Sequence, residues 1–211
     1  MTSERGLRHA AAFDSIGARY DEAFPHKDGQ LAAGEWLLER LTPGSRVLDA
    51  GCGTGLPTAA QITAAGHHLT GVDVSARMIE LARENVPGAE FRQADLSAAG
   101  LGDGYDAIVA FFVLLMIPLD GIPEALRLLH DRLRPGGLFC LSMVEADLED
   151  VPIAFLGQEL IVSAYLREEL QELVEAAGFV VEELNVISYA PQTTKAVPEV
   201  QLFLNCRRPQ G

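Results

Sequence analysis

Residues 46–55 read RVLDAGCGTG, a short apolar run that leads directly into three glycines at alternate positions. The apolar run is typical of a buried strand, and glycines allow a tight turn in which the backbone approaches a ligand closely. Eighteen residues beyond Gly55, a second apolar run ends in GVDVS with Asp73. We therefore expect two strands whose carboxyl ends carry a glycine turn and a carboxylate.

The rest of the chain alternates apolar runs with amphipathic segments. We expect strands at 46–50, 68–74, 89–94, 105–114 and 138–144, and helices at 57–65, 76–85, 122–133 and 168–177. Two further strands, 180–189 and 200–206, follow with only the segment APQTTKAVPE between them, which is typical of a hairpin. Because continuously apolar strands that alternate with helices are typical of a parallel sheet covered on both faces, the pattern predicts an α/β fold. This fold is a Rossmann-like, doubly wound sheet, mostly parallel, with a reversed last strand.

Two additional segments accompany this pattern, one before it and one within it. Phe13, Ile16, Tyr20 and Phe24 recur at helical spacing, and a second helix is expected at 30–41, so residues 1–42 are interpreted as an N-terminal helical cap. Residues 145–166 interrupt the alternation with an acidic stretch, EADLEDVP, and an apolar one, IAFLGQELIV. We expect a lid insertion there, on a single domain of residues 1–211; the alternative is a cover for the sheet edge.

Composition narrows the class of partner. The net charge of −14 disfavours nucleic acid, which requires a basic surface. No apolar run approaches the ~18 residues of a membrane span, and the first residues lack a signal-peptide core, so we expect a cytoplasmic protein without a membrane partner. The three cysteines are far apart, which predicts neither a disulfide framework nor a metal site. A monomer and a homodimer both remain open.

The residue before the glycine turn distinguishes two cofactor classes. A dinucleotide places its pyrophosphate at this turn and prefers GxGxxG, whereas this chain has GxGxG preceded by Asp49. A carboxylate there repels pyrophosphate and suits the ammonium of a methionine moiety. The charge argument therefore favours S-adenosylmethionine, with S-adenosylhomocysteine as the product, over a nicotinamide cofactor.

These motifs together resemble the class I S-adenosylmethionine-dependent methyltransferases from about Phe13 to Arg207. The matching pieces are FDSIGARYD, VLDAGCGTG, GVDVSARMIELAR, FRQADL, YDAIVAFFVL, LRPGG and the EEL…EAAGF helix. The resemblance implies that Asp73 binds the ribose hydroxyls and Asp95 the adenine amino group. Further cofactor contacts implied in the same way are Tyr20, Asp49, Gly51, Cys52, Gly53, Gly55, Val74, Met78, Leu96, Ala110 and Phe111.

The sequence indicates the residues that would bind the methyl acceptor less clearly than those that would bind the cofactor. Similar small-molecule methyltransferases often carry a histidine where Met116 stands and another where Ala164 stands, so two candidate bases are missing. The remaining weak candidates for a catalytic residue are His26, Glu145 and Tyr165, and His9 is expected in a mobile terminus. An apolar pocket is expected from Phe24, Phe112, Met116, Phe155, Leu156 and Leu160.

The leading hypothesis is methyl transfer to a small, apolar metabolite or natural product. Three alternatives stay open: a cyclase or isomerase of the same fold that binds the cofactor without transferring methyl, a nicotinamide-dependent oxidoreductase, and a non-catalytic binding module. The NPPY-type loop of some amino-group methyltransferases is absent after residue 109, where AFFVLL stands. This difference argues against methylation of nucleic-acid bases.

Overall fold

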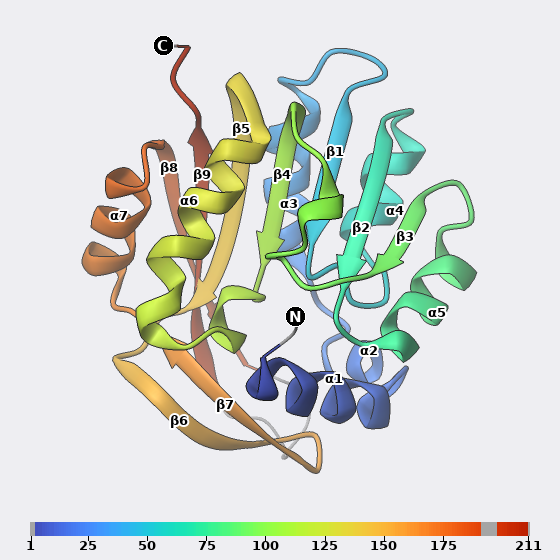
Figure 1. Ribbon diagram of the computed structural model, residues 1–211, viewed down its shortest axis with the longest axis vertical. Helices are drawn as coiled ribbons and strands as arrows, with labels where there is room; N and C mark the ends of the chain where they lie inside the picture. Colours follow the sequence, from blue (N-terminus) through green and yellow to red (C-terminus); the bar gives the residue numbers. More distant parts are fainter. Residues whose placement is uncertain (1–2, 191–197, 211) are drawn as a thin grey trace.

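A seven-stranded sheet forms the centre of the computed structural model, which describes residues 3–190 and 198–210 (Figure 1). Its strand order is β3-β2-β1-β4-β5-β9-β8. Strand β9 pairs antiparallel with both β5 and β8, while the other pairs are parallel. The bounds are β1 Arg46–Ala50, β2 His68–Asp73, β3 Glu90–Gln93, β4 Tyr105–Phe111, β5 Leu133–Val144, β8 Val180–Tyr189 and β9 Glu199–Arg207. The expected fold class, with its reversed last strand, is confirmed.

Helices cover both faces of the sheet. One face packs on α3 (Asp28–Leu38), α4 (Thr58–Ala64) and α5 (Ala76–Asn85), whose buried residues Leu37, Ile62 and Ile79 share a core cluster. The other face packs on α6 (Ile122–Arg132) and α7 (Arg167–Ala176). Strand residues alternate between the two clusters, as the two-residue period of a strand requires. No described helix has the length and apolar character needed to cross a membrane.

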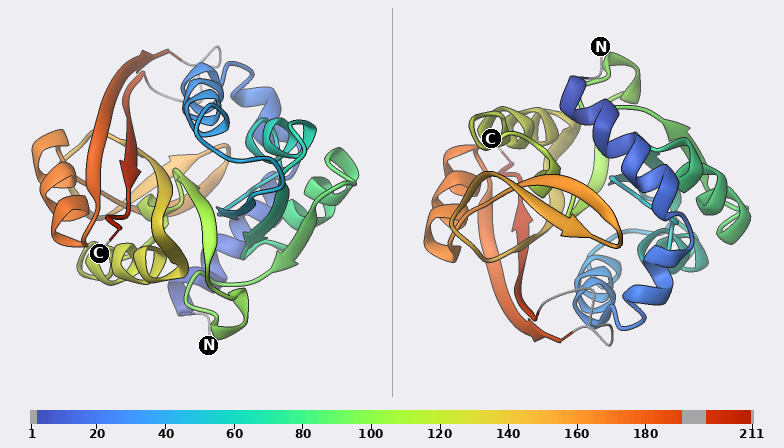
Figure 2. Two further views of the ribbon diagram at one scale, coloured as in Figure 1. Left: turned by 90° about the horizontal axis from the view of Figure 1, so that it is seen from above. Right: turned by 90° about the horizontal axis from the view of Figure 1, so that it is seen from below.

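A third layer lies across the carboxyl ends of the parallel strands. It consists of α1 (Glu4–Ile16), α2 (Arg19–Ala23) and a separate hairpin of β6 (Leu148–Phe155) and β7 (Gln158–Ala164). Figure 2 shows α1 and this hairpin side by side over that end of the sheet. The Arg5 side chain joins them, because its guanidinium donates to the Ile161 carbonyl at 2.9 Å and pairs with Asp150.

The structure corrects several expected boundaries. The N-terminal stripe is two helices rather than one, because Gly17 adopts a φ of 52° and ends α1. Strand β4 ends at Phe111 rather than 114, and Phe112, with a φ of 58°, turns the chain into the short helix η2 (Leu114–Met116). Strand β5 begins at Leu133 rather than 138, since Leu133 pairs with Tyr105 before a register shift.

Candidate functional site

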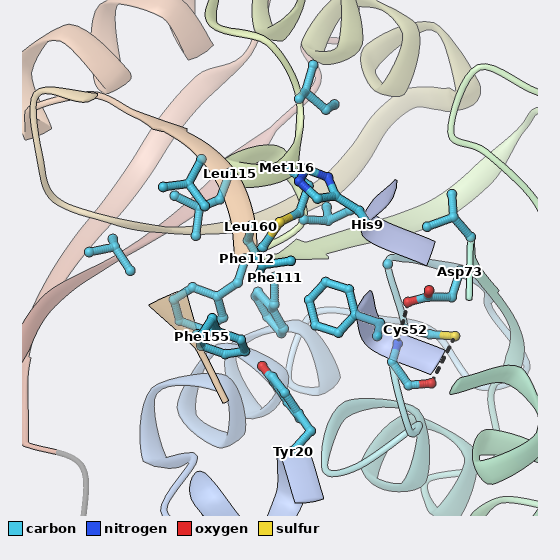
Figure 3. Close-up of a pocket in the computed structure, with 18 of the residues that line it drawn as sticks. His9, Tyr20, Cys52, Asp73, Phe111, Phe112, Leu115, Met116, Phe155 and Leu160 are labelled. Atoms are coloured by element: carbon cyan, nitrogen blue, oxygen red, sulfur yellow. Dashed lines mark hydrogen bonds between the residues drawn. The ribbon is translucent and has the colours of Figure 1, made fainter. Parts of the chain in front are cut away.

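A cavity of about 1130 Å³ lies between the carboxyl ends of the strands and the layer of α1, α2 and the hairpin. Strands β1, β2 and β4 contribute the loops at its floor, whereas the N-terminal helices and the hairpin contribute its cover. Figure 3 shows Asp73 and Cys52 at one side of this pocket and Phe112 and Phe155 at the other. The cavity therefore has a polar end at the glycine loop and an aromatic end below the cover.

The glycine loop is held by backbone contacts to β2. The N–H groups of Gly51 and Cys52 both donate to the Val72 carbonyl, at 2.8 and 2.9 Å. Gly51 has a φ of 76°, and an added Cβ would lie 2.5 Å from the Cβ of Val113, so a larger residue does not fit. The loop thus brings its backbone to the cavity in one defined conformation.

Asp73 connects the loop to the following helix. Its Oδ2 accepts a hydrogen bond from the Gly53 N–H at 3.0 Å, and its Oδ1 accepts from the Ser75 N–H at 2.9 Å. From the cover, Asp14 on α1 accepts from the Arg77 N–H at 3.0 Å, so the cover is fastened to the start of α5. Asp73 is consequently fixed in orientation, and each of its oxygens keeps lone pairs for a ligand.

Asp49 is the second carboxylate at the polar end. The residue is 3% exposed, and its Oδ2 has no hydrogen-bond partner among the described residues. Burial, together with the negative charge of Asp73, raises the pKa of Asp49 to about 7, and burial also raises the pKa of Asp73. No described cation forms a salt bridge with either group. This end of the cavity is therefore suited to a ligand that carries positive charge.

The structure brings most of the expected site residues to this cavity. Among the expected cofactor contacts, those that line it are Tyr20, Asp49, Gly51, Cys52, Gly53, Asp73, Val74, Met78, Asp95, Leu96 and Phe111. Among the expected pocket residues and bases, those that line it are Phe24, His26, Phe112, Met116, Glu145, Phe155 and Leu160. Segments 20–30, 49–54, 72–78 and 94–97 thus meet at one place although they are distant in sequence.

Four expected residues lie outside the lining. Gly55 packs towards α5, where an added Cβ would meet Val86 at 3.2 Å. Ala110 faces the opposite cluster from its neighbour Phe111, because side chains alternate along β4. Leu156 lies in the turn of the hairpin with a φ of 48°. Tyr165 donates its hydroxyl to the Leu119 carbonyl at 3.1 Å.

Two of the candidate bases are therefore poor ones. Tyr165 lies outside the cavity lining, and burial raises the pKa of its hydroxyl. Glu145 lines the cavity, but Arg167 binds both of its oxygens at 2.6 and 2.7 Å, and these hydrogen bonds lower its pKa. A carboxylate stabilised in its ionised form is a weak proton acceptor. His26 lines the cavity from the segment between α2 and α3.

His9 belongs to the cavity, contrary to the expectation of a mobile terminus. The residue is 3% exposed, and its Nε2 accepts a hydrogen bond from the Ile161 N–H at 3.2 Å. Burial, and then the charge of Arg5, lower its pKa, so the ring is held neutral. Its position four residues before Phe13, on the same helical stripe, is the sequence signal that could have placed it.

The aromatic end is built from three separate segments. Phe24 stacks on Phe155 of the hairpin, with centroids 5.7 Å apart, and on Tyr189 at the end of β8, 6.0 Å apart. Tyr20 lies 5.3 Å from Phe24, and burial raises the pKa of its hydroxyl. Tyr189 and its strand partner Glu199 were not expected from the sequence, where no motif marks them.

Comparisons with known proteins agree with this geometry. A family model described as "Methyltransferase domain" matches residues 26–184. Malonyl-[acyl-carrier protein] O-methyltransferase from Erwinia pyrifoliae is 35% identical over 175 residues, which span 80% of this chain and 64% of that protein. Demethylmenaquinone methyltransferase from Clavibacter sepedonicus is 30% identical, over 83% of this chain and 73% of that protein.

Solved structures agree on the fold. The 1,6-didemethyltoxoflavin-N1-methyltransferase of Burkholderia thailandensis superimposes with a TM-score of 0.75 and 23% identity, over 99% of this chain and 91% of that one. The [4+2]-cyclase SpnF superimposes with a TM-score of 0.73 and 21% identity, over 98% and 97%. At these identities the likeness concerns the fold alone. The matched family domain and the two curated relatives show that this chain belongs to the class I S-adenosylmethionine-dependent methyltransferase family.

Proposed function

We propose that this chain transfers the methyl group of S-adenosylmethionine to a small molecule held in the cavity. The observation that carries the proposal is the pair of carboxylates beside the glycine loop: Asp49 is buried, Asp73 is partly exposed, and neither forms a salt bridge with a described cation. The cofactor has an ammonium and a sulfonium group, so it supplies the positive charge that this end of the cavity lacks. A pyrophosphate at the same place would add negative charge to two carboxylates.

The residues present fit this cofactor in shape as well as in charge. Gly53 has a φ of 52°, and no atom lies within 4 Å of an added Cβ, so the loop leaves open space on the cavity side. Asp73 retains lone pairs for ribose hydroxyls, while Val74 and Met78 offer apolar contacts for the adenine and Asp95 an acceptor for its amino group. These roles come from the resemblance, and the common lining supports them.

The chain's contribution to the reaction is positioning. When bound, the cofactor supplies a methyl group already activated by the sulfonium. The protein holds the acceptor in line at near-attack distance, and the cover of α1 and the hairpin excludes water. The cavity of about 1130 Å³ exceeds the range of about 300–1,000 Å³ typical of one drug-sized ligand, which supports simultaneous binding of cofactor and acceptor.

A second function is favoured by one specific observation. Arg167 neutralises Glu145, and Met116 and Ala164 stand where similar enzymes carry histidines. Of the two histidines described in the cavity lining, His9 and His26, the first already accepts the Ile161 N–H at its Nε2. A cyclase or isomerase of the same fold would bind the cofactor without consuming it. The relatives named above are methyltransferases with different acceptors, and the first of them is matched over only 64% of its length. A cytoplasmic location, the lack of a nucleic-acid partner and a monomeric or homodimeric state stay predictions.

The test combines calorimetry with product analysis. Wild-type protein is titrated with S-adenosylmethionine, S-adenosylhomocysteine and NADH, alongside Asp73→Asn and the matched control Asp131→Asn, whose side chain is 77% exposed on α6. We expect micromolar binding of both adenosyl ligands, no binding of NADH, and weaker binding in Asp73→Asn alone. Formation of S-adenosylhomocysteine with a metabolite extract supports methyl transfer, whereas binding without consumption supports the cyclase. Absence of adenosyl binding by folded, ligand-free protein would refute both.

A further inference from the structure

The aromatic end of the cavity contains one carboxylate that the proposed methyl transfer does not use. Glu199 opens β9, directly opposite Tyr189 on β8, and both residues line the cavity. Directly opposite residues of an antiparallel pair place their side chains on the same face. The carboxylate of Glu199 therefore lies in the same wall as the Tyr189 ring, on which Phe24 stacks.

Glu199 has the environment of a ligand-binding carboxylate. Within residues 3–190 and 198–210, its side-chain hydrogen bond comes from Gln201, whose Nε2 donates to Oε1 at 2.7 Å, and the second oxygen accepts none. Burial raises the pKa of Glu199 although this hydrogen bond acts in the opposite direction. The neighbouring Tyr189 hydroxyl is buried and has no hydrogen-bond partner among the described residues. The Tyr189 hydroxyl is thus unsatisfied within the described residues, and the second oxygen of Glu199 is free of side-chain hydrogen bonds to them, beside an aromatic surface.

The charges around the cavity favour an acceptor that carries a positive charge. Apart from Glu199, the lining contains five carboxylates, namely Asp49, Asp73, Asp95, Glu124 and Glu145. Lys27 is a cation in the lining, and it pairs with Asp21 and donates to the Leu56 carbonyl at 2.9 Å. Glu145 is paired with Arg167 and Glu124 with Arg127, whereas no described cation forms a salt bridge with Glu199.

From this arrangement we propose that the acceptor is an aromatic or apolar compound with a basic amine, and that Glu199 binds the ammonium against the rings of Tyr189 and Phe24. Aromatic faces attract cations through their quadrupole, and a carboxylate beside them adds a charged hydrogen bond. The Tyr20 ring already has a cation above it, the Lys27 ammonium, 5.2 Å from its centroid. Acceptors with a carboxylate or phosphate are disfavoured by the same wall. This inference rests on the proposed function, because it assigns the acceptor of that site.

The experiment uses three probes with one ring system: tryptamine, 3-ethylindole and indole-3-propionate, which carry a positive, a neutral and a negative side chain. Each is titrated by calorimetry into full-length protein saturated with S-adenosylhomocysteine. We expect tryptamine to bind about tenfold more tightly than 3-ethylindole, and indole-3-propionate to bind most weakly. Glu199→Gln is expected to remove the preference for tryptamine and to leave the affinity for 3-ethylindole unchanged.

Glu124→Gln is the matched control, because it removes one negative charge from the lining at a side chain that is 75% exposed and paired with Arg127. It should keep the tenfold preference. Wild-type protein that binds S-adenosylhomocysteine but does not prefer tryptamine would overturn the acceptor class alone, as would a preference that survives in Glu199→Gln. Wild-type protein that does not bind S-adenosylhomocysteine would overturn the proposed function and this inference with it.

Discussion

The affinity for S-adenosylmethionine should depend on pH through Asp49. This carboxyl is 3% exposed, and burial raises its pKa to about 7 in the ligand-free protein. A cationic ligand binds the ionised form more tightly and therefore lowers the pKa of Asp49 in the complex. Binding consequently releases a proton wherever Asp49 is protonated in the free protein.

The magnitude follows from the ionised fraction. With a pKa of about 7, roughly one molecule in eleven has an ionised Asp49 at pH 6, and roughly ten in eleven at pH 8. The affinity should therefore rise about tenfold, or about 1.4 kcal/mol, between these values and level off above pH 8. At pH 7 each bound ligand should release about half a proton.

Isothermal titration calorimetry between pH 6 and 8, in buffers with different ionisation enthalpies, measures both quantities. Asp49→Asn is the reference, because it keeps the size of the side chain and cannot ionise. The ligand's own amino group titrates in the same way in both proteins, so the difference between the two curves isolates Asp49. We expect the variant to bind about tenfold to a hundredfold more weakly at pH 8, the range of one charged hydrogen bond. Identical pH curves for the two proteins would refute the reasoning.

Three further outcomes are expected. Because burial raises the pKa of Asp49 above its unfolded value, the contribution of this residue to the free energy of unfolding of the ligand-free protein should fall as pH rises from about 4 to 7. In urea, Asp49→Asn should be roughly 1–4 kcal/mol more stable than wild type at pH 8, and equal stability there would contradict this. Gly53 and Gly66 both have positive φ values, 52° and 83°, and open space around an added Cβ, but of the two only Gly53 lines the cavity. Calorimetry should therefore show at least tenfold weaker S-adenosylhomocysteine binding for Gly53→Ala and unchanged binding for Gly66→Ala. Equal binding by the two variants would argue against the role of the glycine loop. Arg5→Leu should lower the free energy of unfolding by about 1–3 kcal/mol, because it leaves the Ile161 and Ile117 carbonyls without their hydrogen-bond donor. Arg8→Leu, whose native side chain is 66% exposed, should change it by less than about 0.5 kcal/mol. Equal effects in urea unfolding would mean that the Arg5 contacts do not hold the cover in place.

The strands and helices of the sheet layer follow from local patterns. The apolar run at 46–50, and the alternation of apolar runs with amphipathic segments from 68 to 144, predict strands and helices from the residues within each segment. Boundaries differ where a neighbouring strand intervenes, as at Leu133, which extends β5 by pairing with Tyr105. Local residue preference cannot anticipate such an extension, because the hydrogen bonds come from another segment.

The cover was less predictable than the sheet. The sequence predicts a lid at residues 145–166 without indicating its secondary structure, and in the fold residues 148–164 form a hairpin that packs on α1. The sequence predicts a mobile terminus around His9, yet this residue is buried and its Nε2 accepts a hydrogen bond from Ile161 of the hairpin. The sequence alone offers Glu145 as a candidate base, but in the fold Arg167, 22 residues away, binds its carboxylate. Each of these differences depends on a contact between segments that are distant in the chain.

The amino-acid sequence alone therefore determined the sheet, the glycine loop and the placement of Asp49 and Asp73 at the same edge of the sheet. Each is a short motif at the end of a buried strand, and parallel strands bring their carboxyl ends to one edge. The tertiary structure added the enclosed aromatic end, where Phe24, Phe155, Tyr189 and Glu199 meet from the N-terminal, hairpin and C-terminal segments. The pKa of Asp49 and the ionic state of Glu145 also follow from tertiary structure, since burial and charged neighbours control both.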